Sequence, residues 1–190
     1  MKEKITIPFY NDLLFKYFVY DNEDEGCQYI LKKIIEEITP IRCKELYVIN
    51  SELMTHHYRE KRSILDVRVK TQEGEYINIE VQRDYTGANP RRARFHGSLI
   101  DASTSYPKEE WKDLPHMIII FITEEDVLGY GLPIYHVHRT IDENNQIFDD
   151  GSEIIYINAS IQEDNALGRL MHDFLCSETS DMHYQPPLLR

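Results

Sequence analysis

The hydrophobic positions of residues 64–82, ILDVRVKTQEGEYINIEVQ, alternate with polar ones. Two alternating runs flank Gln72-Glu73-Gly74, and a three-residue loop that ends in glycine is typical of a β-hairpin, because glycine accepts a positive φ. The register places Asp66 opposite or nearly opposite Glu80, with Gln82 on the same face as Glu80. That face of the predicted hairpin carries acids, cations and amides, whereas the other is apolar. Its residues are Ile64, Asp66, Arg68, Lys70, Tyr76, Asn78, Glu80 and Gln82.

The rest of the pattern predicts helices that alternate with strands. Asn89 followed by Pro90 predicts the start of a helix that runs to about residue 104. The run 116–122, HMIIIFI, is typical of a strand buried on both faces. Apolar spacing predicts further helices over 11–20, 27–38 and 163–177, and further strands over 44–53, 132–140 and 153–159. We therefore predict an α/β or α+β domain, with helices flanking a mixed central sheet that contains an antiparallel meander over 44–82.

Length and composition narrow the class of protein. The chain has 190 residues, of which 42% are hydrophobic, so we expect one domain over 1–190. No apolar run approaches the roughly 20 residues of a membrane helix, and the N-terminus lacks a signal-peptide pattern. Three scattered cysteines are too few for a disulfide framework, so we expect a cytoplasmic protein with reduced thiols.

The net charge of −12 argues against a general nucleic-acid coat protein. It does not argue against a nuclease, in which a local basic patch beside an acidic metal site decides binding.

The polar face of the hairpin has two interpretations. Opposed carboxylates of Asp66 and Glu80 repel each other unless a positive charge lies between them, and Mg²⁺ favours one or two carboxylates completed by water and phosphate oxygens. Alternatively, the face is solvated, and Arg68 and Lys70 neutralise the acids.

The hairpin motif resembles a known nuclease signature. An Asp, a hairpin turn and then Glu-x-Lys characterise the PD-(D/E)xK nuclease superfamily, and ILDVRV with INIEVQ is similar to the branch of PD-(D/E)xK nuclease family transposases, or Rpn-type recombination-promoting nucleases. Other segments that resemble this branch are NDLLFKYF, RRARFHGSLIDA, MIIIFITEEDVLGYGLPIYHVHRTI, DGSEIIYINA and ALGRLMHDFLCSETSDMHY. The resemblance covers nearly the whole chain. Members usually extend beyond its end at QPPLLR, so we expect a C-terminal truncation.

The resemblance implies a restriction-endonuclease-like core and a metal-dependent DNA endonuclease associated with transposition or recombination. Asp66 and Glu80 would hold Mg²⁺ or Mn²⁺, with the backbone carbonyl of Val81 as a third ligand. Gln82 occupies the position of the superfamily lysine, as is usual in this branch, but an amide brings no charge and cannot act as a base. Arg92, Arg94 or Lys70 could supply the missing cation, and we choose Arg92 because it also matches the arginine of the family's helix motif.

Several residues have weaker assignments. Asp12 is a candidate helper near the metal, or simply the partner of Lys16 in an i,i+4 ion pair. His136 and His138 have the spacing of a two-histidine metal site without an evident third ligand, and His172-Asp173 are interpreted as surface or packing residues. The predicted DNA contacts are Arg83, Arg91, Arg92 and Arg94, although a helix balanced against acidic neighbours would show the same pattern.

Two classes of function follow. The first is the metal-dependent endonuclease. Its expected partner is DNA, we expect no association with a membrane, and a homodimer stays open as an alternative to a monomer. The second is a catalytically inactive, nuclease-derived module that binds nucleic acid or protein. The two carboxylates favour the enzyme, whereas the acidic surface favours the binding module.

Overall fold

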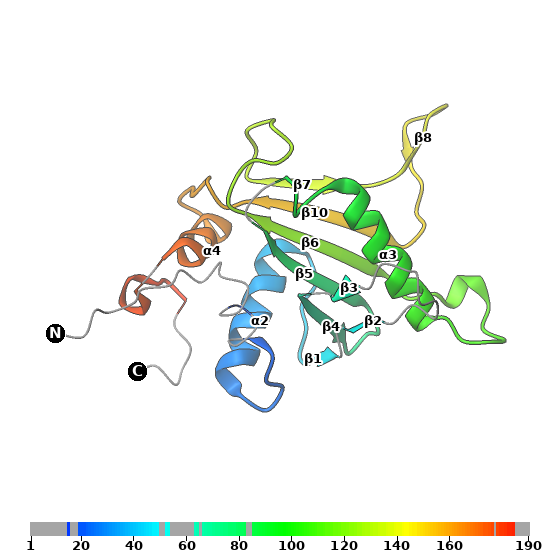
Figure 1. Cartoon of the computed structure of the whole chain (residues 1–190), viewed down its shortest axis with the longest axis horizontal. Helices are drawn as coiled ribbons and strands as arrows, with labels where there is room; N and C mark the ends of the chain where they lie inside the picture. The colour runs from blue at the N-terminus through cyan, green and yellow to red at the C-terminus, as the bar shows by residue number, and fades with distance from the viewer. Residues whose placement is uncertain are drawn as a thin grey trace.

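A six-stranded mixed sheet forms the centre of the molecule (Figure 1). The computed structural model describes residues 15, 19–49, 52–53, 63–64, 66–82, 85–176 and 178–184. In spatial order the strands are β1 (Leu46–Ile49), β4 (Val67–Thr71), β5 (Tyr76–Gln82), β6 (Met117–Thr123), β10 (Ser152–Asn158) and β7 (Ile134–Val137). Strands β1, β4 and β5 pair with one another antiparallel, β6 pairs in parallel with β5 and β10, and β7 closes the sheet antiparallel to β10. The predicted mixed sheet is confirmed.

The predicted hairpin and meander are also confirmed. The Thr71 N–H donates to the Glu75 carbonyl at 3.0 Å, which leaves a three-residue loop with Gly74 at φ 94°. Between β1 and β4 the chain leaves the meander, and β2 (Glu52–Leu53) pairs with β3 (Ser63–Ile64) in a separate two-stranded sheet. The meander therefore carries an insertion that the sequence pattern did not reveal.

Helices cover both faces of the sheet. α2 (Glu25–Ile38) and α4 (Ala166–Leu175) pack on one face, and α3 (Pro90–Thr104) packs on the other. Figure 1 shows α3 crossing the strands, with α2 and α4 next to each other. α3 begins where the sequence predicted, because the Asn89 side chain accepts the Arg91 N–H at 2.9 Å and Pro90 needs no hydrogen-bond acceptor.

The two faces of the hairpin lie in different environments. Val67, Val69, Ile77 and Ile79 are fully buried in the apolar cluster beneath α2 and α4. On the other face Asp66 is buried and Glu80 has no exposed surface, whereas Lys70 is exposed. The interpretation of this face as solvated is therefore wrong for the part that carries the two acids.

The segments around the central sheet differ more from the prediction than the sheet itself does. The strand predicted over 132–140 is shorter, and the chain continues into an exposed hairpin of β8 (Thr140–Ile141) and β9 (Gln146–Ile147), which was not predicted. Two short 3₁₀ helices, η1 (Trp111–Asp113) and η2 (Thr179–Asp181), lie before β6 and after α4. Of the helix predicted over 11–20, Phe15 and Val19 are helical and fully buried, and the other positions except residue 20 lie outside the described residues.

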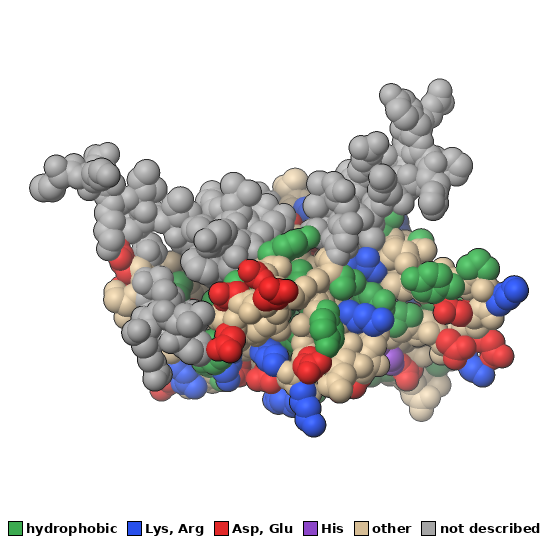
Figure 2. Space-filling model, turned by 90° about the horizontal axis from the view of Figure 1, so that it is seen from below, with side chains coloured by type: hydrophobic (Ala, Val, Ile, Leu, Met, Phe, Trp, Pro, Cys, Tyr) green, Lys and Arg blue, Asp and Glu red, His purple; other side chains and the backbone are tan. Residues whose placement is uncertain are grey.

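Two surface features bear on partners. Within the described residues, no helix combines the length and the apolar character that a membrane crossing requires. Figure 2, seen from the side of α2 and β1, shows acidic and basic side chains interspersed with apolar ones. Among the described residues that this view shows, the acidic side chains are thus not gathered into a single patch.

Candidate active site

Two carboxylates meet at the end of the β4–β5 pair. Val67 faces Ile79 in the ladder, so the next positions along, Asp66 and Glu80, lie opposite each other. The Asp66 N–H donates to Glu80 Oε1 at 3.2 Å, and the Val81 N–H donates to Asp66 Oδ2 at 3.2 Å. Each carboxylate is therefore fixed by the backbone of the opposite strand, as the predicted register requires.

Gln82 joins the two carboxylates. Its Nε2 lies 3.4 Å from Asp66 Oδ2 and 3.5 Å from Glu80 Oε2, so a single amide nitrogen reaches both acids. The loop before α3 packs closely against the Gln82 side chain. A Cβ added at Gly87 would lie only 2.1 Å from Gln82 Oε1. Glycine at this position allows the close approach that keeps the amide against the acids.

Three further side chains surround Glu80. Arg92 Nη2 lies 2.9 Å from Glu80 Oε2 and Arg92 Nη1 donates to the Gly87 carbonyl at 3.0 Å. Asn78 Nδ2 donates to Glu80 Oε1 at 3.0 Å, and His96 Nδ1 lies 3.4 Å from the same oxygen. Arg92 Nε donates to His96 Nε2 at 3.3 Å, which assigns the imidazole proton to Nδ1, on the side of Glu80.

The electrostatics of the site disfavour a second negative charge. Burial, and then the charge of Asp66, raise the pKa of Glu80 to about 7, although the Asn78 hydrogen bond and the Arg92 guanidinium act in the opposite direction. A buried carboxylate pair in this state gains from a further positive charge placed between its oxygens.

The chemistry of the donors fits a hard divalent cation. Asp66 and Glu80 offer carboxylate oxygens, the ligands that Mg²⁺ and Mn²⁺ prefer. The N–H and C=O of one residue in a strand point the same way, so the Val81 carbonyl lies on the side where its N–H reaches Asp66. These residues are therefore suited to hold the predicted ion.

Three of the four predicted DNA contacts lie on α3 within the described residues. Arg92 turns toward Glu80, whereas Arg91 and Arg94 are exposed, and Arg94 also lines a cavity beside the helix. Arg83 and Asp12 lie outside the described residues.

Arg68 does not pair with Glu80, so that expectation is wrong. Its Nη2 donates to Ser103 Oγ at 2.8 Å, and its guanidinium lies 5.1 Å from the centre of the Tyr76 ring. Lys70 is exposed, and its ammonium lies 5.4 Å from the same ring. Neither cation neutralises the acids in the way that the sequence alone suggested.

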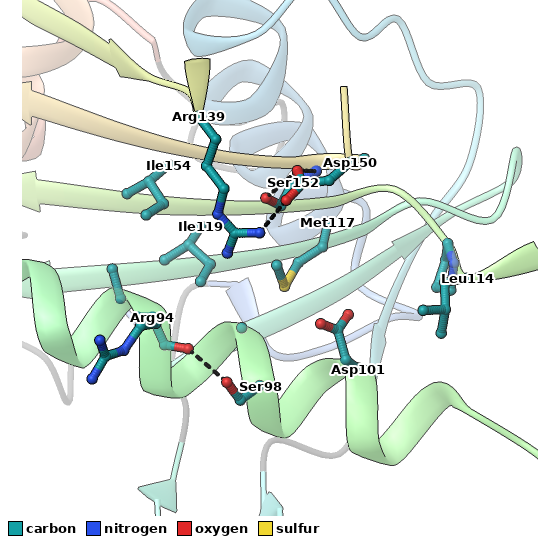
Figure 3. A pocket seen from close by; sticks show the side chains of 14 residues that line it. Arg94, Ser98, Asp101, Leu114, Met117, Ile119, Arg139, Asp150, Ser152 and Ile154 are labelled. Carbon is teal, nitrogen blue, oxygen red and sulfur yellow. Dashed lines mark hydrogen bonds and ion pairs between the residues drawn. The ribbon is translucent and has the colours of Figure 1, made fainter. Parts of the chain in front are cut away.

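The cavity beside Arg94 measures about 270 Å³ and lies between α3 and the first residues of β6 and β10 (Figure 3). Figure 3 shows Arg94, Ser98 and Asp101 along α3, with Arg139 reaching from the segment after β7 to pair with Asp150. Burial, and then the charge of Asp150, raise the pKa of Asp101. Asp101 and Asp150 offset Arg94 and Arg139, so the lining of this cavity is not strongly basic.

His136 and His138 lie beside a common carboxylate. Glu153 Oε1 is 2.8 Å from His136 Nδ1 and 3.6 Å from His138 Nε2. Both histidines of the predicted pair therefore have a carboxylate neighbour, which the sequence did not reveal.

Three residues of the site were not assigned from the sequence. Asn78 lies two positions before Glu80 and therefore shares its face, and His96 lies one helical turn after Arg92, so spacing alone could have linked both to the site. Gly87 gave no such signal, because its role depends on how the loop folds over Gln82.

Comparison with known proteins identifies the family of the chain. The family model described as PD-(D/E)XK nuclease family transposase matches residues 9–165. Neither the curated proteins nor the solved structures give a match. The matched segment contains the whole meander, α3 and β6, and therefore includes both carboxylates of the hairpin. The chain belongs to the PD-(D/E)XK nuclease family transposases.

Proposed function

We propose that this protein is a metal-dependent DNA endonuclease that hydrolyses phosphodiester bonds in transposition or recombination. The observation that supports it is the convergence of two buried carboxylates on one amide nitrogen, at 3.4 Å and 3.5 Å, in a chain whose family is a nuclease family.

Asp66, Glu80 and the Val81 carbonyl would hold the ion. A divalent ion at such a site would polarise the scissile phosphate and lower the pKa of a bound water. In the hydrolysis, the water oxygen would bond to phosphorus while the bond from phosphorus to the leaving oxygen breaks. The water would lose a proton to solvent, and the leaving oxygen would take one up from solvent. Gln82 orients the water or donates to a phosphate oxygen, since an amide can do both without changing charge.

Arg92 is the cation that we assign to the phosphate. It lies in the first turn of α3, where the positive end of the helix also favours a phosphate group. Its side chain is 34% exposed, so it can reach outward as well as to Glu80. In the absence of substrate it offsets the charge of Glu80, and it moves to the phosphate when DNA binds.

A nicking assay tests this proposal. Supercoiled plasmid is incubated with the protein in Mg²⁺, Mn²⁺, Ca²⁺ or EDTA, and the conversion to nicked circles is followed. We expect cleavage in Mg²⁺ or Mn²⁺ and none in EDTA, with a loss of about 10³-fold or more in Asp66→Asn. The matched control is Glu143→Gln, which removes a carboxylate from the exposed β8–β9 hairpin and should cleave like wild type.

The assay also separates the second candidate function. The ion pair between Arg92 and Glu80 is the observation that favours a binding module, because it engages one of the two metal carboxylates. A protein that binds DNA equally in EDTA and Mg²⁺, and cleaves in no metal, would be such a module and would contradict the proposed chemistry.

A further inference from the structure

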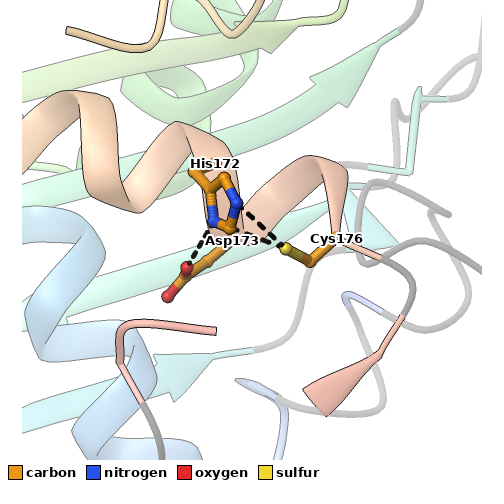
Figure 4. A group of neighbouring side chains, drawn as sticks. All are labelled: His172, Asp173 and Cys176. Atoms are coloured by element: carbon orange, nitrogen blue, oxygen red, sulfur yellow. Dashed lines mark hydrogen bonds and ion pairs between the residues drawn. The ribbon is translucent and has the colours of Figure 1, made fainter. Parts of the chain in front are cut away.

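A second cluster of ligand-type side chains lies at the C-terminal end of α4, on the helix face that His172 and Cys176 share (Figure 4). These residues are four positions apart, which places them on neighbouring turns of one helix face. His172 Nδ1 lies 3.4 Å from Cys176 Sγ and 3.3 Å from Asp173 Oδ1. One ligand atom from each of the three residues lies within 4.8 Å of the others.

The two separations from His172 Nδ1 match the edges of a metal coordination shell. With bonds of about 2.3 Å to sulfur and about 2.0–2.1 Å to nitrogen or oxygen, two ligand atoms of a tetrahedral zinc site lie roughly 3.3–3.6 Å apart. We propose that His172, Asp173 and Cys176 form a binding site for Zn²⁺ or a similar borderline-soft divalent ion, distinct from the carboxylate pair of the hairpin.

The chemistry of the donors sets this site apart from the hairpin. Thiolate and imidazole select zinc-like ions, whereas the all-oxygen set of Asp66 and Glu80 suits magnesium. Binding of the ion would release the thiol proton of Cys176 to solvent, and the thiolate sulfur would donate an electron pair to the metal.

The segment after α4 contacts the cluster through backbone hydrogen bonds to Asp173. Asp173 accepts the His183 N–H at 2.8 Å and the Tyr184 N–H at 2.7 Å, which orients its carboxylate as supporting hydrogen bonds orient metal ligands. The His183 ring lies edge-on to that of His172 with centroids 4.9 Å apart, which places a second imidazole next to the cluster.

The position of the site suggests what the ion would do. Tyr184 donates to the Ala166 carbonyl of α4 at 3.4 Å, and its ring lies 5.6 Å from the ammonium of Lys33 on α2. Phe174, on the buried side of α4, contacts Phe15 with ring centroids 5.8 Å apart. An ion at His172, Asp173 and Cys176 would therefore fasten the segment 178–184 to the helical layer that covers one face of the sheet.

Metal binding to the purified full chain tests the proposal. The metal-free protein is titrated with Co²⁺ and, separately, Zn²⁺, in the presence of excess Mg²⁺. We expect one Co²⁺ per chain, with the visible bands of a tetrahedral ion and the ultraviolet band of a thiolate ligand. At a Zn²⁺ concentration about a hundredfold above Kd, the melting temperature should rise by about 5–10 °C.

Matched variants locate the ligands. Cys176→Ser should abolish the thiolate band, and Cys176→Ser and His172→Ala should each weaken Zn²⁺ binding at least about tenfold. Cys27→Ser removes a partly exposed thiol on α2 and should bind like wild type, as should Asp66→Asn. Equal Zn²⁺ binding by wild type, Cys176→Ser and His172→Ala would overturn the proposal, and Asp173 would then act only as a hydrogen-bond acceptor for the segment 178–184.

Thiol reactivity tests the same site in the wild-type chain, and so does not depend on the folding of any variant. Zn²⁺ should slow alkylation of Cys176 without slowing that of Cys27. If the ion leaves the alkylation of Cys176 unchanged, the site is not there.

Discussion

The two faces of the β4–β5 hairpin are both buried, but they are stabilised in opposite ways. The face toward α2 and α4 presents Val67 and Ile79, which gain from burial without needing a specific partner. The face toward α3 presents Asp66 and Glu80, whose burial costs free energy unless every charge finds a partner. Glu80 accordingly interacts with the Asp66 N–H, Asn78 and Arg92. One face of the hairpin thus contributes to the apolar core, and the other positions the residues to which we assign the chemistry.

Substitutions at two neighbouring positions of β5, Glu80 and Ile79, give the strongest test of this difference between the two faces. Glu80→Gln should lower cleavage by about 10³-fold or more, because a ligand worth several kcal/mol to the reaction is lost. Its melting temperature should change by no more than about 4 °C, since the amide keeps the volume and the Asn78 contact. Ile79→Ala should instead cost about 2–5 kcal/mol of stability through the cavity that it leaves. Plasmid nicking and thermal unfolding, measured on both variants, check the contrast.

The comparison fails if the two phenotypes coincide. A Glu80→Gln protein that unfolds as readily as Ile79→Ala would mean that the polar face carries the fold as well. Cleavage by Ile79→Ala, measured well below its own melting temperature, should stay within about tenfold of wild type.

Much of the local geometry of the site could be predicted from the sequence. Alternation fixed which side of the hairpin Asp66 and Glu80 share, and Gly74 fixed the loop length that brings them opposite each other. The start of α3 followed from Asn89 and Pro90, a cap whose hydrogen bond is made within a few residues. Features of this kind depend on near neighbours in the chain, so a pattern can encode them.

The non-local features could not be predicted in this way. A polar face looks the same in sequence whether water or a helix covers it, and only the path of α3 over the sheet decides that Glu80 is buried. For the same reason the sequence did not distinguish Arg68 from Arg92 as the partner of Glu80. The proximity of His172 to His183 depends on how the segment after α4 folds back, which no periodic pattern encodes.

The two arginines of the polar face offer the next test. Arg92→Ala should lower single-turnover cleavage by about 10²-fold, because a charge that stabilises the attacked phosphate is lost. The Mg²⁺ concentration for half-maximal activity should not rise, because the variant also removes a cation that competes for Glu80. Arg68→Ala removes the contacts to Ser103 and Tyr76, so it should reduce stability and leave the single-turnover rate within about threefold of wild type.

A different result for Arg92 would reassign its role. If Arg92→Ala weakens DNA binding in a salt-dependent way and leaves the single-turnover rate unchanged, Arg92 is a phosphate anchor and not part of the reaction. If Arg68→Ala shows the larger loss of rate, the cation of the reaction lies on β4.

The smallest expected effect is the rise in melting temperature when metal binds, and it tests Asp66 and Glu80 directly. Asp66 and Glu80 share the donor of Gln82, and the raised pKa of Glu80, to about 7, follows from its burial and then from the charge of Asp66. An ion that binds only the folded chain stabilises it by mass action, by about 1.4 kcal/mol at tenfold its Kd, which corresponds to roughly 3–6 °C in melting temperature. Mg²⁺ or Mn²⁺ should therefore raise the melting temperature of wild type, Glu143→Gln and Cys176→Ser by this amount. Asp66→Asn should abolish the rise, because one carboxylate ligand is gone. An equal response of wild type and Asp66→Asn would place the ion elsewhere and remove the physical basis for pairing these two acids.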